Sequence, residues 1–155
     1  MKRWLLALAV LSACSSAPPP EFSLTGARVD ATHWCPGGSV DARYDVHATI
    51  EARNTTKKDV TIESATAEMV LVSVSGAWIE KVGDRYDAGA VVVSPSTIAA
   101  GSTTKLDLTI PSSCTSGLYG SSQSSSGSYT VTVHLVTSAG TFTIAAGNRH
   151  QILAA

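Results

Sequence analysis

The feature that most constrains the fold is a strict alternation of side-chain type over residues 44–53. Every second position carries a side chain suited to a core, and these are Tyr44, Val46, Ala48, Ile50 and Ala52. The positions between them are polar or charged, namely Asp45, His47, Thr49, Glu51 and Arg53. Successive side chains of a β-strand point to opposite faces. A period of two therefore predicts a strand with one buried and one solvated face.

A polar turn and a second strand are expected next. Residues 54–58 read Asn-Thr-Thr-Lys-Lys, which are turn-prone and charged, and Val60 and Ile62 restart the alternation. We interpret residues 43–62 as a strand, a turn and a returning strand, against which the later apolar segments pack. Lys57 and Lys58 are interpreted as solvated residues at the tip of the turn rather than as a phosphate site.

Further short strands are expected along the chain. The candidates cover residues 22–32, 59–74, 78–82, 90–93, 103–111, 129–135 and 141–144. Gly26 is expected at a bulge, and Pro111 is expected to end its strand because proline lacks a ladder donor. Residues 33–38 and 112–128 are interpreted as loops. Segment 59–74 loses its alternation near Ala65, which leaves open whether it forms one long strand or two short ones.

The alternation in these segments also predicts which side chains are buried. The side chains expected in the core are Val46, Ile50, Leu106, Leu108, Val131 and Val133. Those expected in solvent are His47, Glu51, Lys105 and Asp107. About seven short strands separated by turns are typical of a sandwich of two sheets.

Two segments resemble those of bacterial immunoglobulin-like domains. Residues 54–62 look like the hairpin between their second and third strands, and residues 98–111 are similar to their turn-Gly-strand-Pro pattern. Ala100 stands where that family more often has proline. The resemblance implies an all-β fold, an immunoglobulin-like antiparallel β-sandwich of about seven strands over residues 22–155. It implies no activity, because such sandwiches carry many functions.

The N-terminus has the pattern of an export signal. Lys2 and Arg3 precede an apolar run over residues 4–10, which is too short to cross the ~30 Å core of a bilayer. Leu11-Ser12-Ala13-Cys14 resembles the lipobox of bacterial lipoproteins, which implies a signal peptide over 1–13 and a lipid on Cys14. The alternative is an ordinary signal peptide in which the cysteine stands by chance. Residues 14–21 would then form a lipidated, proline-rich tether.

This signal sets the expected location and the expected partners. The protein is expected to be exported and lipid-anchored to the cell membrane through Cys14, and Ser15 resembles the outer-membrane sorting signal of Gram-negative hosts. Without Lys2 and Arg3, nine of the 11 basic side chains remain against 12 acidic ones. The mildly acidic remainder indicates no nucleic acid partner.

The cysteine count fits an exported domain. With Cys14 lipidated, Cys35 and Cys114 remain as an even pair in an oxidising compartment. The resemblance to immunoglobulin-like domains places both in loops at the same end of the sandwich, which implies a disulfide from loop to loop. Such a bridge would differ from the one buried between the sheets of antibody domains. Two unpaired thiols are the alternative.

No catalytic, metal or cofactor site is expected. The four histidines are His33, His47, His134 and His150, and a metal site would need several of them to converge. His47 and His134 both face outward in their strands, which the resemblance assigns to opposite sheets. The sequence contains no Cys-x-x-Cys, no His-Glu-x-x-His and no Gly-x-Ser-x-Gly motif. Asp84 and Asp87 could bind a cation, but we interpret them as turn residues.

A partner-binding tip is expected at the end of the domain farthest from the tether. The first strand carries the chain roughly 30 Å outward at ~3.3 Å per residue. This places His33 and Trp34 at the far end, beside the loop that holds Leu118 and Tyr119. That apolar pair either folds back on the sandwich or contacts a partner, and Trp34 either plugs the core or meets the same partner.

These observations predict a lipid-anchored binding or structural module of the cell envelope with no catalytic activity. An envelope protein is the expected partner. The alternative is an accessory or inhibitory module that docks on an envelope enzyme through its loops. An enzyme in its own right is the least favoured.

Overall fold

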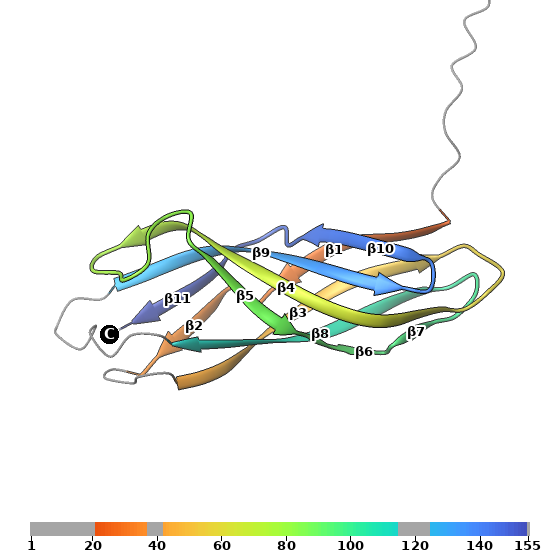
Figure 1. Ribbon diagram of the computed structural model, residues 1–155, viewed down its shortest axis with the longest axis horizontal. Helices are drawn as coiled ribbons and strands as arrows, with labels where there is room; N and C mark the ends of the chain where they lie inside the picture. Colours follow the sequence, from red (N-terminus) through yellow and green to blue (C-terminus); the bar gives the residue numbers. More distant parts are fainter. Residues whose placement is uncertain (1–20, 37–41, 115–124, 155) are drawn as a thin grey trace, which may run out of the picture.

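Two β-sheets pack face to face to form the molecule (Figure 1). The computed structural model describes residues 21–36, 42–114 and 125–154. Across these ranges there is no helix of the length and apolarity needed to span a membrane. The strands are β1 (Phe22–Val29), β2 (Thr32–Cys35), β3 (Ala42–Asn54), β4 (Val60–Ser75), β5 (Arg85–Ala90), β6 (Val92–Ser94), β7 (Thr97–Ile98), β8 (Thr103–Cys114), β9 (Ser125–Thr137), β10 (Gly140–Ala145) and β11 (His150–Ala154).

The strand order is that of an immunoglobulin-like β-sandwich. One sheet has the order β1-β3-β8-β6 and the other has the order β2-β11-β9-β4-β5, with β10 paired to β9 and β7 to β4. The first sheet corresponds to A-B-E-D of immunoglobulin domains, and β4, β9 and β11 correspond to C, F and G. The predicted fold class is confirmed.

The described residues hold eleven strands rather than about seven. Two of the additional strands are β5 and β7, which both pair with β4, and the other two arise from breaks in single strands. The first strand is broken into β1 and β2, which lie in different sheets. The last strand is broken into β10 and β11, which pair with successive parts of β9, at residues 132–137 and 125–129. The breaks divide single strands of the sandwich and leave its strand order unchanged.

Strand β3 forms the middle of the first sheet, paired with β1 on one side and β8 on the other. All six side chains expected in the core are at most 3% exposed. All four expected in solvent are exposed. The alternation over residues 44–53 therefore predicted the register of this strand correctly.

The turn after β3 is a crossover between the sheets and not a hairpin, which corrects the interpretation of residues 43–62. Strand β3 lies in one sheet and β4 in the other. Asn54 holds the crossover from inside, because its buried side-chain amide donates to the carbonyls of Lys58 (2.8 Å) and Ile98 (3.1 Å). Its Oδ1 accepts from the backbone N–H of Thr56 at 3.0 Å.

Two irregularities explain where the sequence pattern loses phase. Strand β4 is one long strand with a register shift between Ile62 and Ser64, so burial resumes at Ala65 with the opposite parity. Strand β1 shifts register between Thr25 and Arg28, around Gly26 at φ 63°. The predicted bulge at Gly26 is confirmed, since a positive φ is a conformation that glycine adopts without strain.

Other boundaries differ from the prediction. Residues 78–82 form no strand, whereas Arg85 and Tyr86 belong to β5 and not to a loop. Strand β8 continues past Pro111 to Cys114. The pairing of β8 with β6 ends at Thr109. Pro111 therefore lies beyond β6, on an edge of the sheet where the missing N–H costs no ladder hydrogen bond. Strand β9 begins within the expected serine loop, at Ser125, and β11 was not expected.

Candidate functional site

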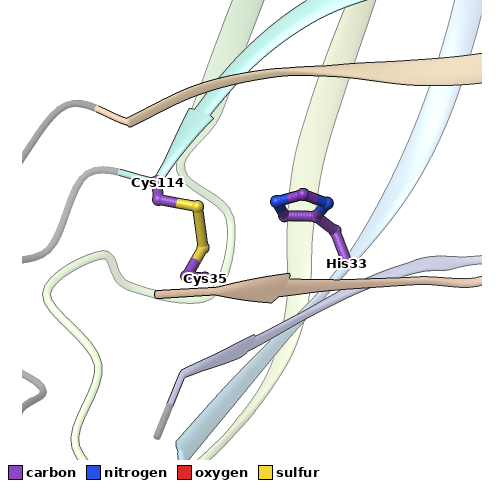
Figure 2. A group of neighbouring side chains, drawn as sticks. All are labelled: His33, Cys35 and Cys114. Atoms are coloured by element: carbon purple, nitrogen blue, oxygen red, sulfur yellow. A yellow bond between two sulfur atoms is a disulfide. The ribbon is translucent and has the colours of Figure 1, made fainter. Parts of the chain in front are cut away.

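A disulfide joins the two sheets at one end of the sandwich. Cys35 ends β2 and Cys114 ends β8, with their Cα atoms 5.7 Å apart (Figure 2). The predicted pairing is confirmed. The expectation that it joins loop to loop is wrong, because residues 32–35 pair in parallel with β11 and are strand rather than loop. Both cysteines are buried, at 9% and 3% exposure, so the bridge resembles the inter-sheet bridge of antibody domains more than expected.

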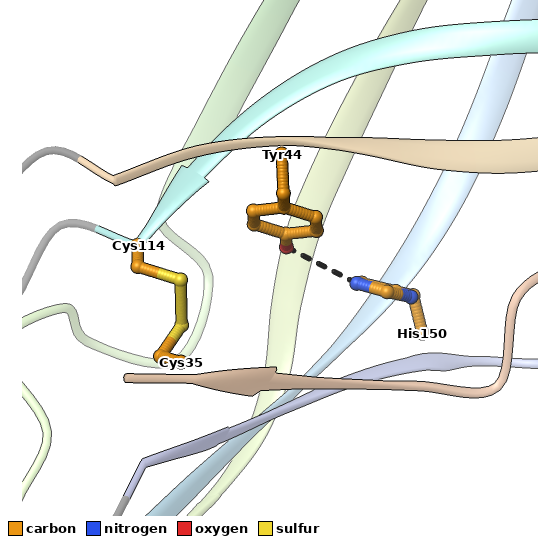
Figure 3. The surroundings of a disulfide bond; sticks show 4 residues. All are labelled: Cys35, Tyr44, Cys114 and His150. Carbon is orange, nitrogen blue, oxygen red and sulfur yellow. Dashed lines mark hydrogen bonds between the residues drawn. A yellow bond between two sulfur atoms is a disulfide. The ribbon is translucent and has the colours of Figure 1, made fainter. Parts of the chain in front are cut away.

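Beside the disulfide, a tyrosine lies between two histidines from the opposite sheet. The rings of His33 and Tyr44 stack with centroids 3.6 Å apart and an interplanar angle of 4°. The Tyr44 hydroxyl lies 3.1 Å from Nε2 of His150 (Figure 3). Nδ1 of His150 lies 2.7 Å from the carbonyl oxygen of Asp30. A carbonyl can only accept, so Nδ1 carries a proton and Nε2 of the neutral ring accepts from Tyr44.

Burial keeps these groups uncharged. It lowers the pKa of His150, against the raising effects of the Asp30 carbonyl and carboxylate. It also lowers the pKa of His33 and raises the pKa of Tyr44 to about 12. At neutral pH the two imidazole rings are neutral and the Tyr44 phenol is protonated. The three side chains therefore form a polar contact between the sheets and offer no activated nucleophile.

A second polar contact holds the loop between β4 and β5. The Glu80 carboxylate accepts hydrogen bonds from Nε1 of Trp78, at 3.1 Å, and from the hydroxyl of Tyr129. The Trp78 ring lies over Gly127 of β9, where a Cβ atom would come within 2.6 Å of the ring. Burial, followed by the Glu80 hydrogen bond, raises the pKa of Tyr129.

Exposed apolar side chains gather at this same end. Trp34 is 63% exposed, and Ile79 and Val82 in the β4–β5 loop are 54% and 60% exposed. Strand register places Trp34, Leu153, Ser126 and Ser75 in one row across the sheet. The β4–β5 loop therefore begins roughly 14 Å from Trp34, at about 4.8 Å per strand. We call Trp34, Ile79 and Val82 the apolar tip.

The four residues expected at a partner-binding tip have different positions. Trp34 is exposed, as a contact residue would be, and does not plug the core. His33 is half-buried and stacks inward on Tyr44. Leu118 and Tyr119 lie outside the described residues, as does Cys14. Ile79 and Val82 are not among the predicted contact residues, because the sequence predicts a strand over residues 78–82.

The remaining candidates have structural roles. Asp84 and Asp87 accept hydrogen bonds from the backbone N–H groups of Lys81 and Gly89. Asp84 lies in the loop before β5, which agrees with the turn interpretation, whereas Asp87 lies within β5, which corrects it. His47 and His134 lie on opposite sheets, as expected. His47 contacts Asp30 at 3.1 Å and His134 contacts Thr143 at 3.0 Å. His150 is almost fully buried, and no sequence pattern indicated its role.

The solved structures that this chain resembles include two of low sequence identity. A PapD-like domain of human CEP192 is 15% identical over 96% of this chain and 94% of that chain, with a TM-score of 0.31. AggA, the major subunit of aggregative adherence fimbriae type I from Escherichia coli, is 9% identical over 90% of this chain and 99% of that chain, with a TM-score of 0.36. No family model and no curated protein matches the sequence. Similarity at this level carries no argument about function.

Proposed function

We propose that the protein is a lipid-anchored binding module of a bacterial cell envelope, without catalytic activity, which meets a protein partner through the apolar tip. The observation that carries the proposal is the position of Trp34. Its side chain is 63% exposed on a strand that ends in a buried disulfide.

The direction of the chain supports this orientation. Phe22 begins β1 at one end of the sandwich, and Cys35 ends β2 at the other (Figure 1). The lipobox-like residues 11–14 and the proline-rich residues 18–20 precede Phe22. A lipid on Cys14 would therefore hold the Phe22 end near the bilayer and leave the apolar tip directed away from it.

The chemistry of the tip supports binding rather than catalysis. Tryptophan is among the residues that contribute most to protein interfaces. Backbone pairing with β11 and the bridge to β8 fix the strand that carries Trp34, so little conformational entropy is lost on binding. Beneath it, Tyr44 and His150 are hydrogen-bonded to each other, and His33 stacks on Tyr44. These uncharged groups form a structural contact.

Site-specific photocrosslinking in the native host would test this function. A photoreactive residue replaces either Trp34 or Val92 in the full-length, lipidated protein. Val92 is the matched control, since it is 68% exposed on β6 at the edge of the first sheet. We expect a discrete crosslinked protein from position 34 that is absent from position 92. Equal crosslinking from both positions, or none from position 34, would refute the tip as the contact.

The side chains can be tested by substitution in the same protein. Trp34→Ser should weaken capture of the crosslinked partner while leaving the melting temperature within a degree or two, because an exposed side chain contributes little to stability. Leu118→Ser with Tyr119→Ser should do the same if that pair belongs to the contact. A sharp fall in melting temperature with capture intact would instead identify the substituted side chains as part of the core.

A further inference from the structure

Three side chains with metal-binding atoms converge beside the disulfide. A ring nitrogen of His33 and the Sγ atoms of Cys35 and Cys114 all lie within 4.8 Å of one another (Figure 2). Within residues 21–36, 42–114 and 125–154, no other group of three such residues meets. The three come from both sheets, with His33 and Cys35 on β2 and Cys114 on β8.

The His33 ring is free to act as a ligand. No described residue hydrogen-bonds to its nitrogens, and its one ring contact is the stack on Tyr44. His150 differs, because both of its nitrogens are engaged, by Tyr44 and by the Asp30 carbonyl. Burial lowers the pKa of His33, so that the ring is neutral at neutral pH, as a metal ligand must be.

The sulfur atoms become ligands only after reduction. In the disulfide they are bonded to each other, whereas metal ions bind the thiolate. A dithiol reductant supplies two electrons and is itself oxidised to a disulfide. The bond between Cys35 and Cys114 breaks, and one proton goes to each sulfur. Binding of a divalent ion then releases both protons to solvent.

Two thiolates and a neutral imidazole are a ligand set that zinc prefers, and water completes a tetrahedral site. We propose that the reduced protein binds one zinc ion through Cys35, Cys114 and His33. The disulfide and the metal are then alternative links between β2 and β8, and the redox state selects which one is present.

The required movements are small. With Zn–S near 2.3 Å and Zn–N near 2.0 Å, ligand atoms on one tetrahedral ion lie roughly 3.3–3.8 Å apart. Reduction releases the sulfur atoms from their bond, and the His33 nitrogen, within 4.8 Å of both, must approach by up to about 1.5 Å. Rotations about side-chain bonds of β2 can supply these shifts, since its exposed edge has no further strand beside it among the described residues.

Zinc titration of the reduced chain tests the proposal. The full chain carries Cys14→Ser, so that only Cys35 and Cys114 supply thiols. The protein is unfolded in urea, reduced with a phosphine and refolded with the phosphine present. The phosphine takes up an oxygen atom from water and becomes the phosphine oxide. Competition with a chromophoric chelator then measures zinc affinity and stoichiometry. Cobalt substitution reports thiolate ligation through its ultraviolet charge-transfer band.

We expect one zinc per reduced chain and none per oxidised chain. His33→Ala should weaken zinc binding at least about tenfold, since loss of even an outer partner of a ligand costs that much. His47→Ala, which removes an exposed ring on the other sheet, should change nothing. Equal zinc binding by oxidised and reduced chains, or unchanged affinity in His33→Ala, would overturn the proposal. A reduced chain that stays unfolded by near-ultraviolet circular dichroism in saturating zinc would overturn it as well.

Discussion

The ring of His33 lies flat against the ring of Tyr44, with centroids 3.6 Å apart, although the two residues belong to different sheets. Among the described residues, two further links join the sheets at the same end of the sandwich. They are the bridge from Cys35 to Cys114 and the hydrogen bond between Tyr44 and His150. The end that carries the apolar tip is thus held by covalent, polar and aromatic contacts together.

Removal of the bridge should destabilise the protein strongly. It spans a sequence separation of 79 residues, and closing such a loop stabilises the folded state by about 4–5 kcal/mol in the chain-entropy model. We expect the Cys35→Ala, Cys114→Ala variant to lose most of that free energy of unfolding in urea. Non-reducing peptide mass spectrometry of the native protein should find Cys35 linked to Cys114. Two freely alkylatable thiols in the exported protein would contradict the bridge.

Truncation of Ile50 should show the register of β3. The side chain is 1% exposed in the core, so Ile50→Ala should lower the free energy of unfolding by about 2–5 kcal/mol through lost burial and the cavity left behind. Glu51→Ala is the control, because Glu51 is the next residue along the strand and faces solvent. Urea denaturation measures both variants, and equal losses would mean that the two faces are assigned wrongly.

Gly127 should not tolerate a methyl group. A Cβ atom there would lie 2.6 Å from the Trp78 ring, so Gly127→Ala must displace the ring and weaken its hydrogen bond to Glu80. We expect a loss of about 1–3 kcal/mol, as for other overpacked sites. Gly147→Ala is the matched control, because its Cβ would meet only the Ala27 carbonyl at 3.6 Å. Thermal denaturation should separate the two variants, and equal melting temperatures would refute the close contact.

Stability should fall in mild acid. Burial lowers the folded-state pKa values of His150 and His33 below 6.5, while the Asp30 charge acts in the opposite direction on each. The unfolded chain therefore binds more protons in mild acid than the folded chain. The free energy of unfolding keeps its full value above about pH 6.5 and decreases as the pH falls below it. Urea denaturation between about pH 7.5 and 5.5 measures this decrease before most carboxylates titrate.

His150→Gln separates this effect from other titrations. The substitution removes the buried titrating ring, so the pH dependence should become shallower. If His150→Gln and the wild-type protein have the same slope, His150 does not carry the effect.

The anchor is tested at Cys14. If Cys14 carries lipid, Cys14→Ala should block processing or release the protein from the membrane fraction of the native host. Fractionation followed by immunoblotting measures this, with Ser16→Ala as the control. Unchanged membrane partitioning of the Cys14 variant would contradict the lipobox interpretation.

Local alternation predicted the parts of the fold in which one face of a strand is buried. Residues such as Val46, Leu108 and Val131 lie in strands of this kind, and their burial followed from a period of two. The bulge after Ile62 was visible in the sequence only as a loss of phase. A register shift and a break between two strands give the same local pattern, so the sequence could not distinguish them.

Pairings distant in sequence could not be predicted. The turn chemistry of Pro36-Gly37-Gly38 predicts a loop over residues 33–38, yet parallel pairing with β11 makes residues 33–35 part of a strand. The hairpin interpretation of residues 54–58 failed because local turn chemistry does not specify which sheet the chain enters next. At the tip, the sequence left open whether Trp34 plugs the core or meets a partner, and its exposure excludes the core plug. The roles of Tyr44 and His150 depend on contacts 106 residues apart, which no motif encodes.

The break between β1 and β2 has a mechanical consequence. A pull on Phe22 that the rest of the domain resists runs along β1, whose ladder to β3 extends from the Phe22–Asn54 pair to the Val29–Ala48 pair. Antiparallel hydrogen bonds lie perpendicular to the strands, so a pull along β1 shears the whole ladder at once instead of unzipping it bond by bond. If force continues past Trp34, the bridge passes it directly to Cys114. The 78 residues between the two cysteines then stay outside the path of the force.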